Sequence, residues 1–175
     1  RVMGLGMSPP SMALPLGPVV VQFIGAAVIA IAVAVYNGAG MRIVVVSAAL
    51  SLVAWLGYVL ATAVGFEVAA ASGIGAFVGS FVGIVVAYRL HVPSVAITTA
   101  AILPLVPGAA VFRGLLGIVE SGDNPAILMA GVTTLAGAAT IGIALAVGAS
   151  LGIYVGQPVR ATLSSVIRAR ARVRR

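Results

Sequence analysis

Two prolines inside one hydrophobic stretch are the strongest indication of chemistry in this sequence. Residues 94–119 are apolar enough to cross a membrane, yet Pro104, Pro107 and Gly108 interrupt them near the middle. Because a proline nitrogen carries no hydrogen, carbonyls one turn earlier lose their helical donors. Glycine in turn accepts backbone angles that other residues avoid. A helix broken in hydrocarbon exposes carbonyls and a new helix amino-terminus, which can bind an ion or a carboxylate.

Three polar side chains accompany this break. Arg113 lies six residues after Pro107 in the same apolar stretch, where an unpaired charge costs at least about 3 kcal/mol. It either binds carbonyls, water, an acid outside the bundle or an anionic substrate, or it extends to the outer surface. Thr98 and Thr99 are expected to line a cavity, although helical hydroxyls often bond their own backbone. The predicted substrate path comprises Thr98, Thr99, Pro104, Pro107, Gly108 and Arg113.

The remaining composition excludes most catalytic and metal sites. The chain of 175 residues has no cysteine, no lysine, one histidine and three acids. These counts exclude thiolate metal sites, a cysteine nucleophile and a phosphate loop with a lysine. The acids, Glu67, Glu120 and Asp123, lie between hydrophobic stretches, so no pair of carboxylates is available within the membrane. We expect no enzyme activity, no cofactor and no metal, and we expect His91 to be solvated in a cytoplasmic loop.

Five hydrophobic stretches must position these residues. The hydrophobic set makes up 62% of the chain and charged residues only 7%, a composition unsuited to a water-exposed surface. A helix needs roughly 20 apolar residues to cross a hydrocarbon core about 30 Å thick. The sequence therefore predicts an all-α, polytopic transmembrane bundle whose fourth span is broken at Pro104–Gly108. We expect five spans, at about residues 19–36, 43–64, 68–88, 94–119 and 126–154.

The charged residues between these stretches alternate in sign along the chain. Arg42 and Arg89 follow the first and third stretches, whereas Glu67 and the pair Glu120 and Asp123 follow the second and fourth. Five crossings place all the basic segments on one side, and the positive-inside rule assigns that side to the cytoplasm. The carboxyl terminus is then cytoplasmic, and the first span begins outside.

The two ends of the chain are predicted to lie outside the membrane domain, residues 19–156. Residues 1–18 contain four prolines and begin with Arg1 rather than methionine, so we expect a linker or a segment from a missing upstream region. Residues 157–175 form a predicted basic cytoplasmic tail. The net charge of +7 could indicate binding to nucleic acid or to anionic lipid. The arginines gather directly after a hydrophobic helix, so we predict that the tail contacts anionic lipid and not nucleic acid. The lipid-contacting arginines are Arg168, Arg170, Arg172, Arg174 and Arg175.

Two sets of glycines at four-residue spacing predict close helix packing. Small residues on one helix face let neighbouring backbones approach in a membrane. Such a face forms either a fixed packing seam or a sliding surface for a moving helix, and the sequence leaves both open. The sets are Gly75, Gly79 and Gly83 in the third stretch, and Gly148, Gly152 and Gly156 in the fifth.

The segment ILPLVPGAAVFRG, residues 102–114, resembles the signature of the threonine/serine exporter family, in its carboxyl-terminal membrane domain. The order of the stretches and the turn from Gly38 to Arg42 also resemble this family, over about residues 19–154. The resemblance implies a secondary exporter of threonine, serine and other small amino acids in the bacterial inner membrane. It also implies that this chain is one half, partnered by a homologous first membrane half or subunit in an oligomer. Pro104, Pro107 and Gly108 match the family's motif.

Two hypotheses follow, and two alternatives stay open. A zwitterionic substrate would place its carboxylate near the new helix amino-terminus or Arg113, and its ammonium near the freed carbonyls. Proton coupling would use an acid of the other half, because no carboxylate lies within a span here. A non-transporting scaffold subunit would pack protein tightly around the break instead of a watery cavity. A passive channel would have one continuous polar stripe, whereas the polar residues here are scattered.

Overall fold

The described part of the computed structural model, residues 18–92 and 94–173 with side chains as far as residue 158, consists of helices and short turns. Four helices are long and apolar enough to cross a membrane, and a fifth crossing results if the bent pair Ser94–Leu105 and Gly108–Glu120 counts as one. This confirms the predicted all-α bundle with a broken fourth span. The elements are α1 (Val19–Tyr36), α2 (Met41–Ala63), α3 (Val68–Leu90), α4 (Ser94–Ile102), the 3-10 turn η1 (Leu103–Leu105), α5 (Gly108–Glu120) and α6 (Pro125–Val173).

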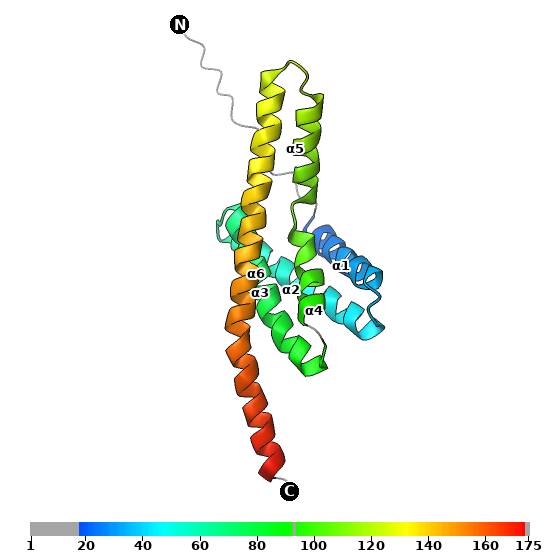
Figure 1. The fold of residues 1–175 in the computed structure, drawn as a ribbon, viewed down its shortest axis with the longest axis vertical. Helices are drawn as coiled ribbons and strands as arrows, with labels where there is room; N and C mark the ends of the chain where they lie inside the picture. The colour runs from blue at the N-terminus through cyan, green and yellow to red at the C-terminus, as the bar shows by residue number, and fades with distance from the viewer. Residues whose placement is uncertain (1–17, 93, 174–175) are drawn as a thin grey trace.

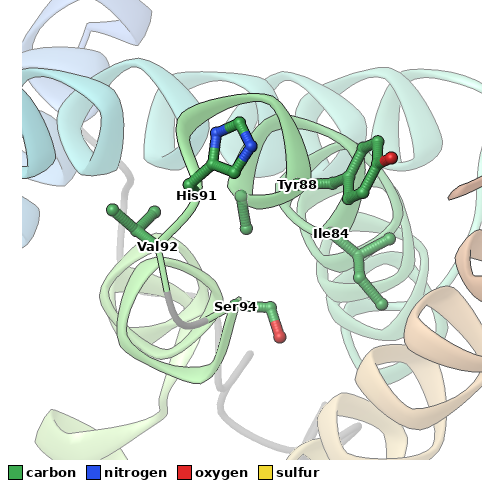
Figure 2. Close-up of a pocket in the computed structure, with 6 residues that line it drawn as sticks. Ile84, Tyr88, His91, Val92 and Ser94 are labelled. Carbon is green, nitrogen blue, oxygen red and sulfur yellow. The ribbon is translucent and has the colours of Figure 1, made fainter. Parts of the chain in front are cut away.

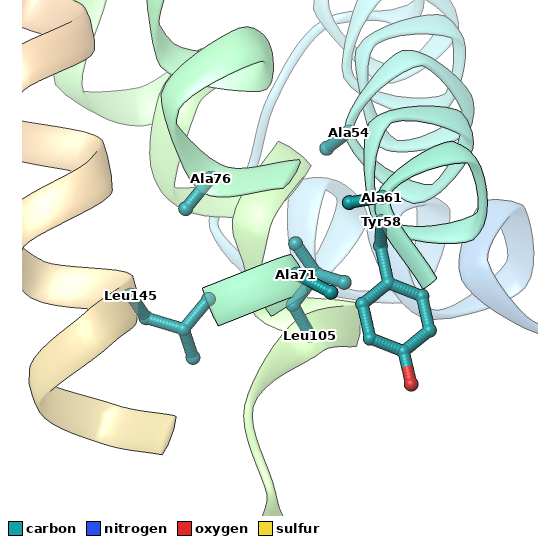
Figure 3. Close-up of a cluster of buried hydrophobic side chains, with 7 residues drawn as sticks. All are labelled: Ala54, Tyr58, Ala61, Ala71, Ala76, Leu105 and Leu145. Carbon is teal, nitrogen blue, oxygen red and sulfur yellow. The ribbon is translucent and has the colours of Figure 1, made fainter. Parts of the chain in front are cut away.

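Helices α1 to α4 form a bundle that packs against the middle of α6 (Figure 1). Its buried positions are mostly alanine and serine, as in Ala30, Ala54 and Ser51, because small side chains let membrane helices approach closely. The Ser51 hydroxyl donates to the Ala26 carbonyl of α1 at 3.2 Å and so ties two helices together. One core cluster joins α2, α3, η1 and α6 (Figure 3) and fixes the position of the break through Leu105.

Helices α3 and α6 form the most extensive contact in the bundle, and they run in parallel. A Cβ atom added to Gly148 would meet the backbone of Gly73, and one added to Gly152 would meet the Phe77 carbonyl one turn later. The same residue spacing on both helices keeps this contact in register over several turns. The α6 glycine set therefore lies directly against α3.

The other glycine set, on α3, faces different partners. A Cβ on Gly75 would lie 2.7 Å from the Ala54 carbonyl oxygen of α2, and one on Gly83 would lie 2.8 Å from the Thr98 methyl of α4. Contacts below 3 Å do not occur for real side chains, so α2, α3 and α4 touch at this face without space for a methyl group. Helix α3 thus uses one face for α6 and another for α2 and α4.

Three of the helices end in the same left-handed turn. Gly38, Gly65 and His91 have φ angles of 69°, 100° and 56°. After each of them, the next N–H donates to a carbonyl five residues earlier, as from Phe66 to Ala61 at 3.1 Å. This is the Schellman arrangement, which favours glycine because a Cβ is strained at positive φ.

Replacing Gly65 by alanine is expected to lower the free energy of unfolding by about 1 kcal/mol, because a Cβ is strained in the left-handed conformation. Thermal unfolding of the detergent-purified protein measures the change. Gly25→Ala is the matched control, since Gly25 lies within α1 and a Cβ there meets nothing within 4 Å. An equal loss of stability in both variants would contradict the strain argument.

Helix α6 is longer than the fifth span predicted from the sequence. It runs without interruption for 49 residues and includes Pro158, whereas we expected a span to about residue 154 and a separate tail. Alanine and arginine, which are strong helix formers, recur after Pro158 and favour continuation. Arg168, Arg170 and Arg172 fall in this helix, but their side chains lie outside the described part of the chain, as do Arg174, Arg175 and residues 1–17.

Helix α5 and the first half of α6 form an antiparallel hairpin that extends past the ends of α1 to α4 (Figure 1). Glycines permit this contact as well, since a Cβ on Gly117 would lie 3.4 Å from the Cα of Gly131. Large apolar side chains such as Phe112, Leu115 and Met129 are exposed on the hairpin. A surface of this kind requires lipid or protein around it.

Candidate functional site

The break between α4 and α5 is built from two consecutive tight turns. The Val106 N–H donates to the Leu103 carbonyl at 3.0 Å and closes η1. Pro107 then adopts φ −79° and ψ 51°, and the Gly108 N–H donates to the Val106 carbonyl at 2.8 Å. These angles and this bond define an inverse γ-turn, for which proline supplies the fixed φ. The chain changes direction here, and the two helical segments are bent by 53°.

A cavity of about 370 Å³ lies beside this break. We call it the break cavity. Its walls are residues 104–110 of the break, Trp55 and Tyr58 near the end of α2, Glu67 and Ser72 at the start of α3, and α6 around Gly137. This volume falls in the range of small-molecule sites, which are mostly apolar with a few polar groups.

The polar groups of the break cavity differ in how far they are already bonded. The hydroxyls of Ser72 and Thr140 donate to carbonyls of their own helices at 2.7 Å each. Glu67 is exposed and precedes α3 without making a side-chain capping bond. The buried indole nitrogen of Trp55 has no hydrogen-bond partner among the described residues, and its ring lies 5.1 Å from that of Tyr58.

The break cavity contains a partial positive charge and a carboxylate. Gly108, Ala109 and Ala110 line it and form the first turn of α5, where N–H groups lack intrahelical acceptors and the helix dipole is positive. Glu67 supplies the negative charge on another wall. An amino acid carries the complementary pair, a carboxylate and an ammonium group. In the described residues, no three histidine, aspartate or glutamate side chains gather as a metal site.

The structure brings together only part of the predicted substrate path. Pro104, Pro107 and Gly108 line the break cavity. Thr98, Thr99 and Arg113 are not among its lining residues. Thr98 is buried and donates to the Ser94 carbonyl at 2.8 Å, while Thr99 and Arg113 are exposed.

Geometry explains why these three side chains lie elsewhere. The Thr98 methyl packs against Gly83 of α3, about one and a half helical turns before the prolines, and Thr99 points about 100° away from it. Arg113 belongs to α5, the helix that extends past the bundle with the first half of α6 (Figure 1). Pro107 cannot donate to the Leu103 carbonyl four residues earlier, but that carbonyl is not free, because the Val106 N–H donates to it.

Glu67 and the Trp55–Tyr58 pair are site residues that sequence reasoning missed. The sequence predicted Glu67 only as part of an acidic segment outside the membrane, and it predicted no role for the two aromatic residues. Their place beside the break depends on how the α2–α3 turn packs against η1, which no local pattern encodes. The one available indication was that Trp55, Tyr58 and Glu67 all lie near the end of the membrane that the acidic segments share.

Comparison with known proteins identifies the family to which this chain belongs. The sequence profile described as "Threonine/Serine exporter, ThrE" matches residues 22–155. A protein of Mycobacterium tuberculosis named "Probable threonine/serine exporter" is 29% identical over 154 residues, which are 88% of this chain and 28% of that protein. This chain therefore spans little more than a quarter of the relative's length. No solved structure matches the chain. With most of its length matched by the profile, this multi-pass membrane protein belongs to the threonine/serine exporter family.

Proposed function

We propose that this chain is one half of a secondary transporter that exports small amino acids, threonine and serine among them, and that the break cavity is its substrate site. One observation carries the proposal: the helix break faces a cavity of about 370 Å³ rather than tightly packed protein. A scaffold subunit has no need for such a cavity at a broken helix, whereas a transporter does. The relative's printed name supports the same substrates.

In the proposed binding mode the cavity holds the substrate at both of its charges. The carboxylate accepts hydrogen bonds from the first turn of α5, at Ala109 and Ala110, where the helix dipole favours an anion. The ammonium group lies at the Glu67 carboxylate, which also lines the cavity. Glu67 takes the place of the freed carbonyls expected from the sequence, since the Leu103 carbonyl already accepts a bond within η1.

We further propose that the protein lies in the bacterial inner membrane with Arg42 and Arg89 at the cytoplasmic face. The positive-inside rule supports this orientation, and it places the carboxyl terminus in the cytoplasm and Glu67 outside. The break cavity then opens toward the outer face, where an exporter releases its substrate. The exposed apolar hairpin of α5 and α6 fits a proposed contact with lipid and with a homologous first membrane half in an oligomer.

Efflux from preloaded cells tests the proposed function. Cells that carry the full-length gene are loaded with radiolabelled threonine or serine, and the rate of loss is compared with that of cells from which the gene is deleted. Pro107→Ala is expected to lower gene-dependent efflux at least about tenfold, because alanine restores an N–H and frees φ at the inverse γ-turn. Pro125→Ala is the control, since Pro125 begins α6 away from the break. Efflux that does not change when the gene is deleted would overturn the proposal.

A further inference from the structure

A second cavity, of about 340 Å³, lies at the turn between α3 and α4 (Figure 2). We call it the α3–α4 cavity. Its lining residues are Ile84, Ala87, Tyr88, His91, Val92 and Ser94. It lies at the end of α3 that carries Arg89, opposite to the end that carries Glu67. The two cavities thus lie at opposite ends of α3, and both also touch the α4–η1 segment.

His91 is the unusual residue of this cavity. It occupies the left-handed position of a Schellman turn, with φ 56° and ψ 38°, and the Val92 N–H donates to the Ala87 carbonyl at 3.2 Å. At the same position in the turns after α1 and α2 the chain has Gly38 and Gly65. A side chain there costs about 1–2 kcal/mol of backbone strain. Residues held in such strained backbone conformations cluster at functional sites.

The α3–α4 cavity has the chemistry that a zwitterion requires. Figure 2 shows His91 on the side of α3 and Ser94 on the side of α4, with the gap between them. Helix α3 ends here, and the negative end of its dipole favours an ammonium group at this wall. Helix α4 begins here, and its first N–H groups, the Ser94 hydroxyl and the His91 ring can donate to a carboxylate.

We propose that the α3–α4 cavity is a second, cytoplasm-facing binding site for the same zwitterionic amino acid, and that His91 contacts the substrate carboxylate there. This inference rests on the proposed export function and its orientation. Between the two cavities the helices are in tight contact, since a Cβ on Gly83 would lie 2.8 Å from the Thr98 methyl and one on Gly79 would lie 2.7 Å from the Ala54 Cβ. Substrate therefore passes from the inner to the outer site only when α4 moves relative to α3.

His91→Gly tests this site without disturbing the turn, because Gly38 and Gly65 support the same turn elsewhere in the chain. Threonine uptake into inside-out membrane vesicles that contain the full-length protein measures the cytoplasmic face. We expect the half-saturating threonine concentration to rise at least about fivefold, with no decrease in the temperature of thermal unfolding. For His91→Asn we expect a half-saturating threonine concentration within about twofold of the parent's, since asparagine tolerates positive φ and its amide can still donate to a carboxylate.

A half-saturating concentration at the cytoplasmic face that is the same in His91→Gly and the parent would overturn the second site. Counterflow in right-side-out vesicles measures the half-saturating threonine concentration at the outer face. We expect the His91→Gly variant and the parent to have the same value there. If Glu67→Gln lowers transport while His91→Gly has no effect, the proposed function stands and the inference fails. If the parent protein moves neither threonine nor serine, the proposed function fails and the inference fails with it.

Discussion

Gly148→Ala is expected to lower the free energy of unfolding by about 3 kcal/mol. The added methyl would occupy the space of the Gly73 backbone in α3, and a backbone cannot move aside as a flexible side chain can. Helices α3 and α6 must separate, which weakens the contact that joins the bundle to α6. Overpacking of this kind typically costs about 1–3 kcal/mol, and a rigid neighbour places it at the upper end.

The matched control for this substitution lies on the same helix. Gly142 is exposed, and a Cβ there meets nothing within 4 Å, so Gly142→Ala is expected to leave stability unchanged or raise it by up to about 1 kcal/mol through helix propensity. Thermal unfolding of both variants in the same detergent gives the comparison. Equal stability of Gly148→Ala and the parent would show that α3 and α6 are not in the described contact.

Glu67→Gln is expected to reduce threonine efflux about tenfold. Under the proposed function the carboxylate binds the substrate's ammonium group at the wall of the break cavity, and the neutral amide keeps the shape while it removes the charge. A hydrogen bond between charged groups contributes about 1.5–3 kcal/mol, and 1.4 kcal/mol corresponds to a factor of ten. Initial rates of efflux from preloaded cells, normalised to the amount of protein in the membrane, measure the effect.

Glu120→Gln provides the control for charge removal alone. Glu120 ends α5, is exposed and is not among the residues that line the break cavity. We therefore expect the rate of threonine efflux in the Glu120→Gln variant to stay within about twofold of the parent's. A similar decrease of efflux in both variants would mean that the loss of a negative surface charge or impaired membrane insertion lowers transport, and not the loss of a substrate contact.

The sequence predicted those features that depend on neighbouring residues. The long apolar stretches indicated the helices α1, α2 and α3, because the length needed to cross hydrocarbon is a local requirement. Pro104, Pro107 and Gly108 indicated the break for the same reason, since a missing N–H disrupts its own helix. The family was likewise predicted from the short segment around these prolines, and the profile match confirms it.

Features that depend on which helices meet, and on which of their side chains face one another, could not be predicted in this way. Thr98 and Glu67 are the clearest cases: the first packs against Gly83 rather than lining the break cavity, and the second lines that cavity from a turn. Hydropathy also ends a predicted helix where polar residues begin, whereas α6 continues to Val173, because arginine and alanine favour a helix in water as well as in lipid.

The two short helices of the broken span have a consequence for how the protein is made. Helix α4 has 9 residues and α5 has 13, so they measure about 14 and 20 Å at 1.5 Å per residue, and neither alone crosses a core of about 30 Å. Helices α1 to α3 can each leave the translocon sideways as they emerge from the ribosome. The segment from Ser94 onward cannot leave the translocon in this way, because α4 and α5 are each too short. We therefore expect α4 and α5 to stay in the translocon until α6 has been synthesised, and all three helices to enter the bilayer together.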